Sequence, residues 1–201
     1  MTMVRLRDRK KAETRARLAK TALTLFAREG VDNVTIAGIA EAAGVGKGTL
    51  YNYYACKEDI LLEFLAGVEA AALPGIASPR LKGKTPAQVL SAAAWSLLRA
   101  KAEHHQYARL VLARFVGGDA DFLARSEFFQ SAIQTAFAAM FVKLQDEGLV
   151  SRQWTAADLA LRFTVLHIGL SAFWAMEGPP FANAERIVRG QTEIFARGIA
   201  P

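Results

Sequence analysis

Few residues in this 201-residue sequence have the types and spacing that catalysis requires. The histidines are His104, His105 and His167; adjacent histidines point in different directions on a helix, and no His-x3-His or carboxylate pattern completes a metal site. Cys56, the single cysteine, has no evident base partner, and the GVGKG segment at 44–48 lacks the spacing of a phosphate-binding loop. The sequence therefore predicts a protein that is not an enzyme and that holds neither a metal nor a cofactor.

A different chemistry is suggested by residues 47–53, where hydrogen-bonding side chains follow one another on a short predicted helix. These side chains are Lys47, Thr49, Tyr51, Asn52 and Tyr53. Gly46 precedes Lys47 and Gly48 follows it, although a glycine inside a helix costs about 1 kcal/mol relative to alanine. A slim backbone that carries donors and acceptors suits close approach to base edges and phosphates.

Two short helices joined by a tight turn would position these side chains. Thr35 is a good N-cap for a helix that ends near Ala43, and Gly44 can take a positive φ at the turn before a second helix from about Lys47 to Tyr54. Apolar residues at the required offsets line the shared seam: Ile36, Ile39, Ala40, Ala43, Val45 and Leu50. An ordinary helical hairpin is the alternative interpretation, and it requires fewer of these offsets to match.

The residue pattern of almost every other segment also predicts a helix, so the expected fold class is all-α. A helix is expected from Arg9 to Glu29, and another from Lys57 to a point before Pro74. A Pro/Gly-rich connector follows at Gly75–Lys84. Further helices are predicted at about 86–103, 104–116, 120–147, 156–177 and 183–197. We expect a DNA-binding domain at 1–57 and a helical ligand-binding and dimerisation domain at 58–201.

The positive charge of the chain lies entirely in its first quarter. Residues 1–57 hold 11 Lys and Arg against 5 Asp and Glu, a net +6, whereas residues 58–201 hold 14 of each. A charge run can be merely a solvated face, but localised positive charge is also what a phosphate-binding surface needs.

The residues from Thr14 to Phe64 resemble the TetR family of bacterial transcriptional regulators. The resemblance rests on AKTALTLFAREGVDNVTI, the IAEAAGV turn, GTLYNYY and the following KEDIL. It implies an all-helical homodimer whose three N-terminal helices bind a palindromic operator in double-stranded DNA, and whose C-terminal domain often holds a small-molecule inducer. Carried over by position, it assigns DNA contacts to Thr35, Ala37, Lys47, Gly48, Thr49, Tyr51, Asn52, Tyr53 and Lys57. Departures are Gly46 where serine is frequent, Tyr54 where phenylalanine is usual, and Cys56 where a small polar residue is common.

The N-terminal arm and the C-terminal two thirds leave alternatives open. Arg5, Arg7, Arg9, Lys10 and Lys11 are expected either to reach the adjacent minor groove or to form a solubilising tail. Pocket-lining candidates are Trp95, Tyr107, Arg109, Phe115, Phe122, Phe137 and His167, although aromatic residues at helical spacing are often plain core.

The last two predicted helices are the expected dimer surface, because Phe163, Leu166, Leu170, Phe173 and Trp174 crowd the first of them and Gly169 and Ala172 admit a close partner. A central helix buried in the monomer is the alternative.

The apolar run from Phe163 to Met176 is uncharged over only 14 residues, so we expect no membrane span, and one cysteine without a signal sequence suits a cytoplasmic protein. The predicted function is a homodimeric DNA-binding repressor that a small molecule releases from its operator. An activator would have the same sequence features. The competing class is a small-molecule or lipid binding protein whose basic N-terminal domain meets an acidic surface other than DNA. Lys47, Thr49 and Asn52 argue against a membrane, since membrane binding favours Leu, Phe or Trp on the outward face.

Overall fold

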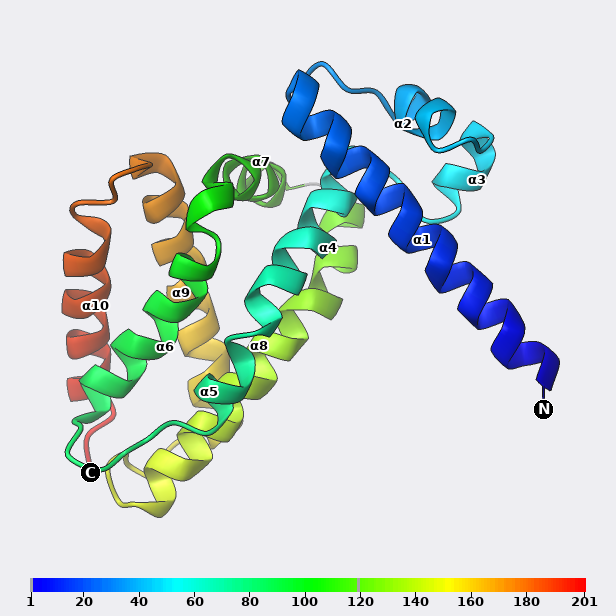
Figure 1. The fold of residues 1–201 in the computed structure, drawn as a ribbon. Coiled ribbons are helices and arrows are strands. Elements are labelled where there is room, and N and C mark those ends of the chain that lie inside the picture. Colours follow the sequence, from blue (N-terminus) through cyan, green and yellow to red (C-terminus); the bar gives the residue numbers. More distant parts are fainter. Residues whose placement is uncertain (1, 119) are drawn as a thin grey trace. The chain divides into compact units, whose positions relative to one another are not determined.

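The computed structural model describes residues 2–118 and 120–201, without the side chains of residues 2–6 and 127–130, and every regular element in these ranges is a helix (Figure 1). The predicted all-α fold class is therefore confirmed. The helices, in chain order, are α1 (Thr2–Glu29), α2 (Ile36–Ala42), α3 (Lys47–Tyr51), α4 (Lys57–Ala70), α5 (Leu73–Ala77), α6 (Pro86–Ala100), the 3-10 turn η1 (Ala102–His104), α7 (His105–Val116), α8 (Ala120–Asp146), α9 (Ala156–Glu177) and α10 (Ala184–Gly198).

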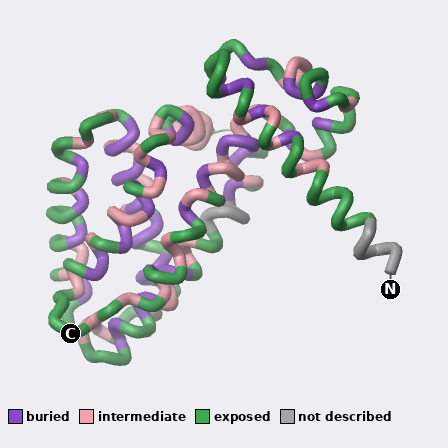
Figure 2. Tube along the Cα trace, viewed as in Figure 1, coloured by how far each residue is buried: buried purple, intermediate pink, exposed green. Residues whose placement is uncertain are grey.

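The chain divides into two compact units, Met1–Phe64 and Leu65–Pro201. The division falls within α4, so the first two turns of this helix belong to the N-terminal unit and its last residues to the C-terminal unit. Each unit has its own buried core, as the purple segments in Figure 2 show.

In the N-terminal unit, the core forms where the C-terminal half of α1 packs against α2 and α3. Leu18, Ala22 and Phe26 recur at helical spacing and are buried, as are Ile39 and Leu50 from the other two helices. Before Thr14 every described side chain of α1 is exposed. The helix nevertheless begins at Thr2, seven residues earlier than the predicted start at Arg9, because Ala, Arg, Lys and Glu favour helix even without a packing partner.

The segment after α4 differs from the prediction of one helix reaching almost to Pro74. Helix α4 ends at Ala70, and Pro74 lies in the first turn of a separate short helix, α5, which occupies part of the predicted connector. Proline lacks a backbone N–H, and the first turn of a helix is where this donor is not needed.

In the C-terminal unit, α8 packs along α9, α6 along α10, and α5 against α8. A capping box starts α6 as predicted at Thr85-Pro86: the Gln88 N–H donates to Thr85 Oγ1 (3.3 Å), and the Thr85 N–H donates to Gln88 Oε1 (2.9 Å). Phe163 meets Phe137 and Phe141 edge to face, with ring centroids 4.8 and 5.9 Å apart. Such pairs contribute about 0.5–1.5 kcal/mol each beyond burial, and they fix α9 against α8.

Helix α9 is apolar on two opposite sides, and this changes which of its residues are available for the predicted dimer surface. Phe163, Leu170 and Trp174 are buried within their own chain, as the monomer-core alternative requires. The apolar side chains that remain uncovered on the other side of the helix are Leu161 (53% exposed), Val165 (64%) and Met176 (72%). By length and composition α9 could also cross a membrane, contrary to the estimate from uncharged runs, but half of its most apolar window is buried inside the protein, as in a core helix.

Candidate nucleic-acid interface

The turn between α2 and α3 has the geometry predicted from its glycine. Gly44 has φ +66°, and its N–H donates to Glu41 O (3.0 Å), while the Val45 N–H donates to Ala40 O (2.9 Å). At the start of α2, the Gly38 N–H donates to Thr35 Oγ1 at 3.0 Å, so the predicted N-cap is confirmed. These hydrogen bonds satisfy backbone groups at the turn and at the start of α2. The orientation of α3 follows from its packing against α2.

Helix α3 carries the predicted reading side chains on its open side. Lys47, Thr49, Tyr51 and Asn52 are exposed, Tyr51 by 55%, whereas Leu50 is fully buried. Tyr53 is half-buried. The helix ends at Tyr51, three residues earlier than predicted, because the N–H groups of Tyr53 and Tyr54 both donate to Leu50 O. Tyr54, just after this turn, is buried in the core.

Gly46 is the N-cap of α3, where glycine is preferred to alanine, whereas Gly48 has no role inside the protein that alanine would prevent. A Cβ added at either position meets no atom within 4 Å, and neither residue has a positive φ. Since Gly48 lies within α3, alanine there would favour the helix. The glycine at position 48 therefore suits close approach of another molecule rather than a need of the fold.

Lys57, predicted as a DNA contact, has its ammonium group directed at the backbone before α2. Nζ donates to Val31 O (2.6 Å), Val34 O (3.3 Å) and Asp32 O (3.4 Å). An ammonium has three protons, and three carbonyls receive them here. Lys57 thus fastens the start of α4 to the loop that ends at Thr35, whose exposed hydroxyl keeps its own proton for donation.

Asp59 is a functional residue that the sequence analysis missed. Its buried carboxylate accepts from the N–H groups of Ala55 (2.9 Å) and Cys56 (3.3 Å), which would otherwise lack partners at the start of α4. An acidic residue three positions after Cys56 is the spacing of an N-terminal capping acceptor, and this signal was available in the sequence. Burial, followed by the charge of Asp59, raises the pKa of the half-buried Cys56 thiol, so the thiol stays protonated and unreactive.

A second missed contact joins α1 to α4. Arg15 donates to Glu63 through Nε (2.7 Å) and its terminal nitrogen lies 2.6 Å from the same oxygen, while its guanidinium lies 4.8 Å from the centre of the Tyr54 ring. Burial, reinforced by Glu63, raises the pKa of the Tyr54 phenol. The phenol therefore remains neutral, and the cluster holds α1, the segment after α3 and α4 in one arrangement.

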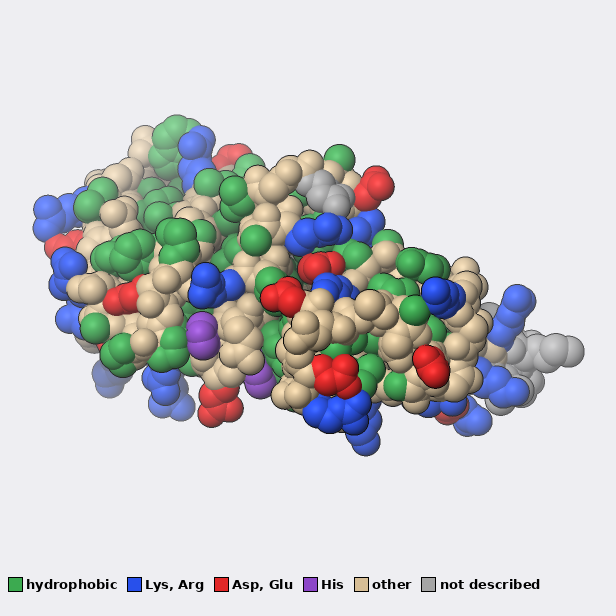
Figure 3. All heavy atoms as spheres, turned by 90° about the horizontal axis from the view of Figure 1, so that it is seen from above, with side chains coloured by type: hydrophobic (Ala, Val, Ile, Leu, Met, Phe, Trp, Pro, Cys, Tyr) green, Lys and Arg blue, Asp and Glu red, His purple; other side chains and the backbone are tan. Residues whose placement is uncertain are grey.

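The basic N-terminal segment is helical. Lys and Arg side chains gather at the N-terminal part of α1 in the view of Figure 3. The exposed residues of this part include Arg7, Arg9, Lys10 and Lys11, and the Arg5 side chain lies outside the described residues. A helix is about 10 Å across, too wide for a minor groove of about 6 Å. In this conformation the segment can approach phosphates but does not form the extended arm that reads a minor groove.

The predicted pocket residues of the C-terminal unit are not all brought together. Tyr107, Phe122, Phe137 and His167 are buried, and the rings of Phe137 and His167 lie 6.0 Å apart. Phe115 is half-buried, and Arg109 is exposed on α7.

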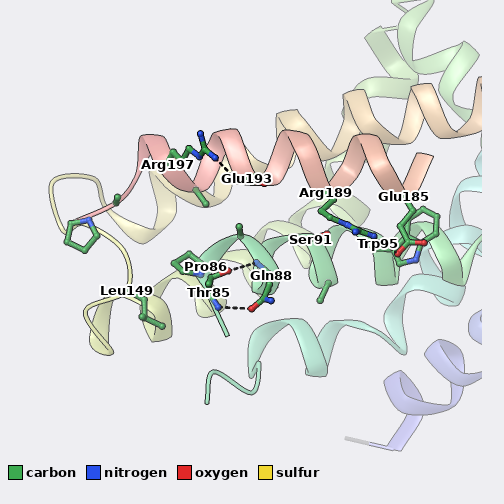
Figure 4. Close-up of a pocket in the computed structure, with 15 residues that line it drawn as sticks. Thr85, Pro86, Gln88, Ser91, Trp95, Leu149, Glu185, Arg189, Glu193 and Arg197 are labelled. Atoms are coloured by element: carbon green, nitrogen blue, oxygen red, sulfur yellow. Dashed lines mark hydrogen bonds and ion pairs between the residues drawn. The ribbon is translucent and has the colours of Figure 1, made fainter. Parts of the chain in front are cut away.

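Trp95 lines a different feature, an open groove of about 850 Å³ between α6 and α10. Figure 4 shows it beside Glu185 and Arg189. It shares no lining residue with the buried group around His167.

An ion pair that the sequence analysis did not anticipate lies in the C-terminal core. Lys101 Nζ donates to Glu69 Oε1 at 2.6 Å, with both side chains only 10% exposed. Burial, followed by the charge of Lys101, lowers the pKa of His167 to about 3. His167 is therefore neutral at physiological pH, with Nε2 3.4 Å from Ser171 Oγ and Nδ1 without a hydrogen-bond partner. Elsewhere in the described part of the chain, no three His, Cys, Asp or Glu residues group as a metal site requires.

Two short helices at a tight glycine turn, the second with an exposed polar side, define the N-terminal unit as a helix-turn-helix module. Comparison with known proteins gives the family. Residues 18–64 match the family model described as bacterial regulatory proteins, tetR family. The chain belongs to the TetR family of bacterial regulators.

The chain is similar to the HTH-type transcriptional regulator TcmR of Streptomyces glaucescens, with 33% identity over 144 residues. This alignment covers 67% of the chain but 63% of TcmR, under two thirds of that relative. Two solved folds are also similar. One is the TetR-family repressor FadR of Thermus thermophilus in complex with lauroyl-CoA (TM-score 0.77, 21% identity, 93% of this chain and 95% of that chain). The other is FadR of Bacillus subtilis in complex with stearoyl-CoA (TM-score 0.65, 15% identity, 92% of this chain and 98% of that chain). At these identities the two structures establish the shared fold.

Proposed function

We propose that this protein is a sequence-specific DNA-binding regulator, a homodimeric repressor that a small-molecule effector releases from a palindromic operator. The observation that carries the proposal is the exposed side of α3, where Lys47, Thr49, Tyr51 and Asn52 stand around a glycine that the fold does not require. A lysine can donate to guanine acceptors and an asparagine to adenine, so these residue types suit major-groove reading. The curated relatives bear the names of regulators rather than enzymes, which agrees with this class.

Within this proposal the other predicted contacts have distinct roles. The exposed Thr35 hydroxyl, with Ala37 beside it, would meet phosphate, and Gly48 would permit the approach of α3. Lys57 would act by holding the Thr35 loop in place, since its three donors already have acceptors. Tyr53, half-buried at the end of α3, would contact DNA only through its accessible edge.

Dimerisation is proposed through the uncovered face of α9 together with α10. Leu161, Val165, Met176 and, on α10, Ile194 are each more than half exposed. A helix that is apolar on two opposite sides is normally buried on both, so a second copy is expected to cover the side that is exposed here. Two copies of α3 could then enter successive major grooves about 34 Å apart.

The effector is proposed to bind in the C-terminal unit. The neutral His167 with its free Nδ1 offers a buried polar group that a ligand could satisfy. The two FadR structures contain acyl-CoA, which makes acyl thioesters reasonable first compounds to screen.

Selection of bound duplexes from a random pool tests the DNA-binding proposal. We expect a two-fold symmetric consensus, and a slope of log affinity against log salt near −0.9 for each neutralised phosphate. Lys47→Ala should weaken binding to the selected site by about 1–3 kcal/mol while the chain remains dimeric in sedimentation. Equal affinity for selected and random duplexes would refute sequence specificity and favour a general acidic partner.

A further inference from the structure

The loop between α5 and α6 concentrates positive charge in a part of the chain that is otherwise balanced. Arg80, Lys82 and Lys84 occupy alternate positions, and all three are exposed. None of them forms an ion pair in the part of the chain that the structure describes. Residues 58–201 hold equal numbers of basic and acidic residues, so this cluster is a local excess rather than a general property.

A cavity of about 320 Å³ opens beside this loop, between α5, α6 and α8. Its walls are mainly apolar, with Ile76, Val89, Ala93 and Met140 among them, while Arg80 and Lys84 belong to the same lining. Because these two cations and the apolar walls border one space, the cavity has an amphipathic character.

A cleft of about 850 Å³ adjoins the cavity, and the two share Pro79 and Lys84. Lys82 and Lys143 line the cleft, and the Lys143 ammonium donates to Ser78 Oγ. Asp146 and Glu147 also border it, but Asp146 is paired with Arg152 at 2.8 Å. The two adjoining spaces are thus lined by four cations, counting Arg80, against one carboxylate without an ion-pair partner among the described residues, Glu147.

We propose that this site binds a phosphorylated amphiphile, with its apolar tail in the cavity and its phosphate among Arg80, Lys82, Lys84 and Lys143. A methylene takes roughly the space of a water molecule, about 30 Å³, so the cavity admits a tail of about ten carbons. A phosphate can accept bonds from several cations at once, which suits four donors better than a single carboxylate does. Binding here is independent of DNA reading; a role as the effector site rests on the proposed function.

Calorimetric titration of the full chain without DNA tests the site directly. We expect octyl phosphate to bind more tightly than octanoate, and octanoate more tightly than octanol or inorganic phosphate. In a series of alkyl phosphates, affinity should rise about fourfold for each added methylene and level off near ten carbons. Octanol binding as tightly as octyl phosphate would overturn the proposal.

Matched variants locate the binding. Arg80→Ala/Lys84→Ala should weaken octyl phosphate binding about tenfold or more, whereas Arg99→Ala/Arg186→Ala removes the same charge from exposed positions outside the site and should change it less than twofold. Gly75→Leu places a side chain in the cavity lining where an added Cβ meets no atom, so it should abolish the chain-length dependence without unfolding the protein. Equal affinity of both double variants would overturn the site.

A separate titration with the selected operator distinguishes this proposal from the proposed function. Octyl phosphate that binds the wild type and lowers its operator affinity supports both the site and its effector role. If the compound binds with the expected variant pattern but leaves operator affinity unchanged, the site stands and the effector role is refuted.

Discussion

Replacing Gly48 with alanine should stabilise the protein and weaken its DNA binding together. Gly48 is exposed within α3, has no positive φ, and an added Cβ meets no atom within 4 Å. Alanine is better than glycine in a helix, and we expect a gain of about 0.5–1 kcal/mol in the free energy of unfolding. For a chain of this size this corresponds to a rise of about 1–4 °C in Tm.

The same methyl group would lie between α3 and the bases. If glycine serves close approach, the added group should cost about as much as a lost base contact, 1–3 kcal/mol, or roughly 5- to 150-fold in Kd for the selected operator. Thermal unfolding followed by circular dichroism and fluorescence anisotropy with labelled operator measure the two effects on one sample.

Gly67→Ala is the matched control. Gly67 is exposed in α4, an added Cβ there also meets open space, and the residue lies outside the reading surface. This variant should gain similar stability and leave operator affinity unchanged. If Gly48→Ala gains stability and binds the operator as tightly as the wild type, the close-approach explanation for this glycine is wrong.

Three further predictions concern the buried contacts and the uncovered face. Lys57→Met should lower the free energy of unfolding, measured in urea, by about 1.5–3 kcal/mol because three carbonyls lose a charged donor. Lys47→Met, at an exposed position, should change it by less than 0.5 kcal/mol. Equal effects would contradict a stabilising role of the hydrogen bonds from Lys57 to these carbonyls. The pKa of His167 is depressed in the folded state, so its stabilising contribution is complete above about pH 6.5 and declines as pH falls toward 3, by at most about 1.4 kcal/mol per pH unit. His167→Gln should therefore remove this pH dependence from the free energy of unfolding between pH 7 and 5. An unchanged pH dependence would show that another group causes it. Val165→Asp should shift sedimentation from dimer to monomer while Val142→Asp, the same change at an exposed valine of α8, should not; two dimeric variants would move the interface elsewhere.

The sequence by itself determined the features that local chemistry controls. Thr85 and Gln88 form their capping box within four residues, and Gly44 supplies its own turn, so neither depends on distant parts of the chain. The helix-turn-helix and the family follow from the same short-range pattern, because the offsets of the buried seam recur within one window.

Tertiary structure decided where long side chains end and which side of an apolar helix is inside. Lys57 reaches carbonyls 23 to 26 residues earlier in the chain, and Arg15 meets Glu63 across 48 residues, distances in sequence at which spacing carries no information. On α9 both sides are apolar, so periodicity could not tell that Phe163 packs against α8 while Val165 remains uncovered. Only the contacts of neighbouring helices remove one side from water, and those contacts are a property of the whole fold.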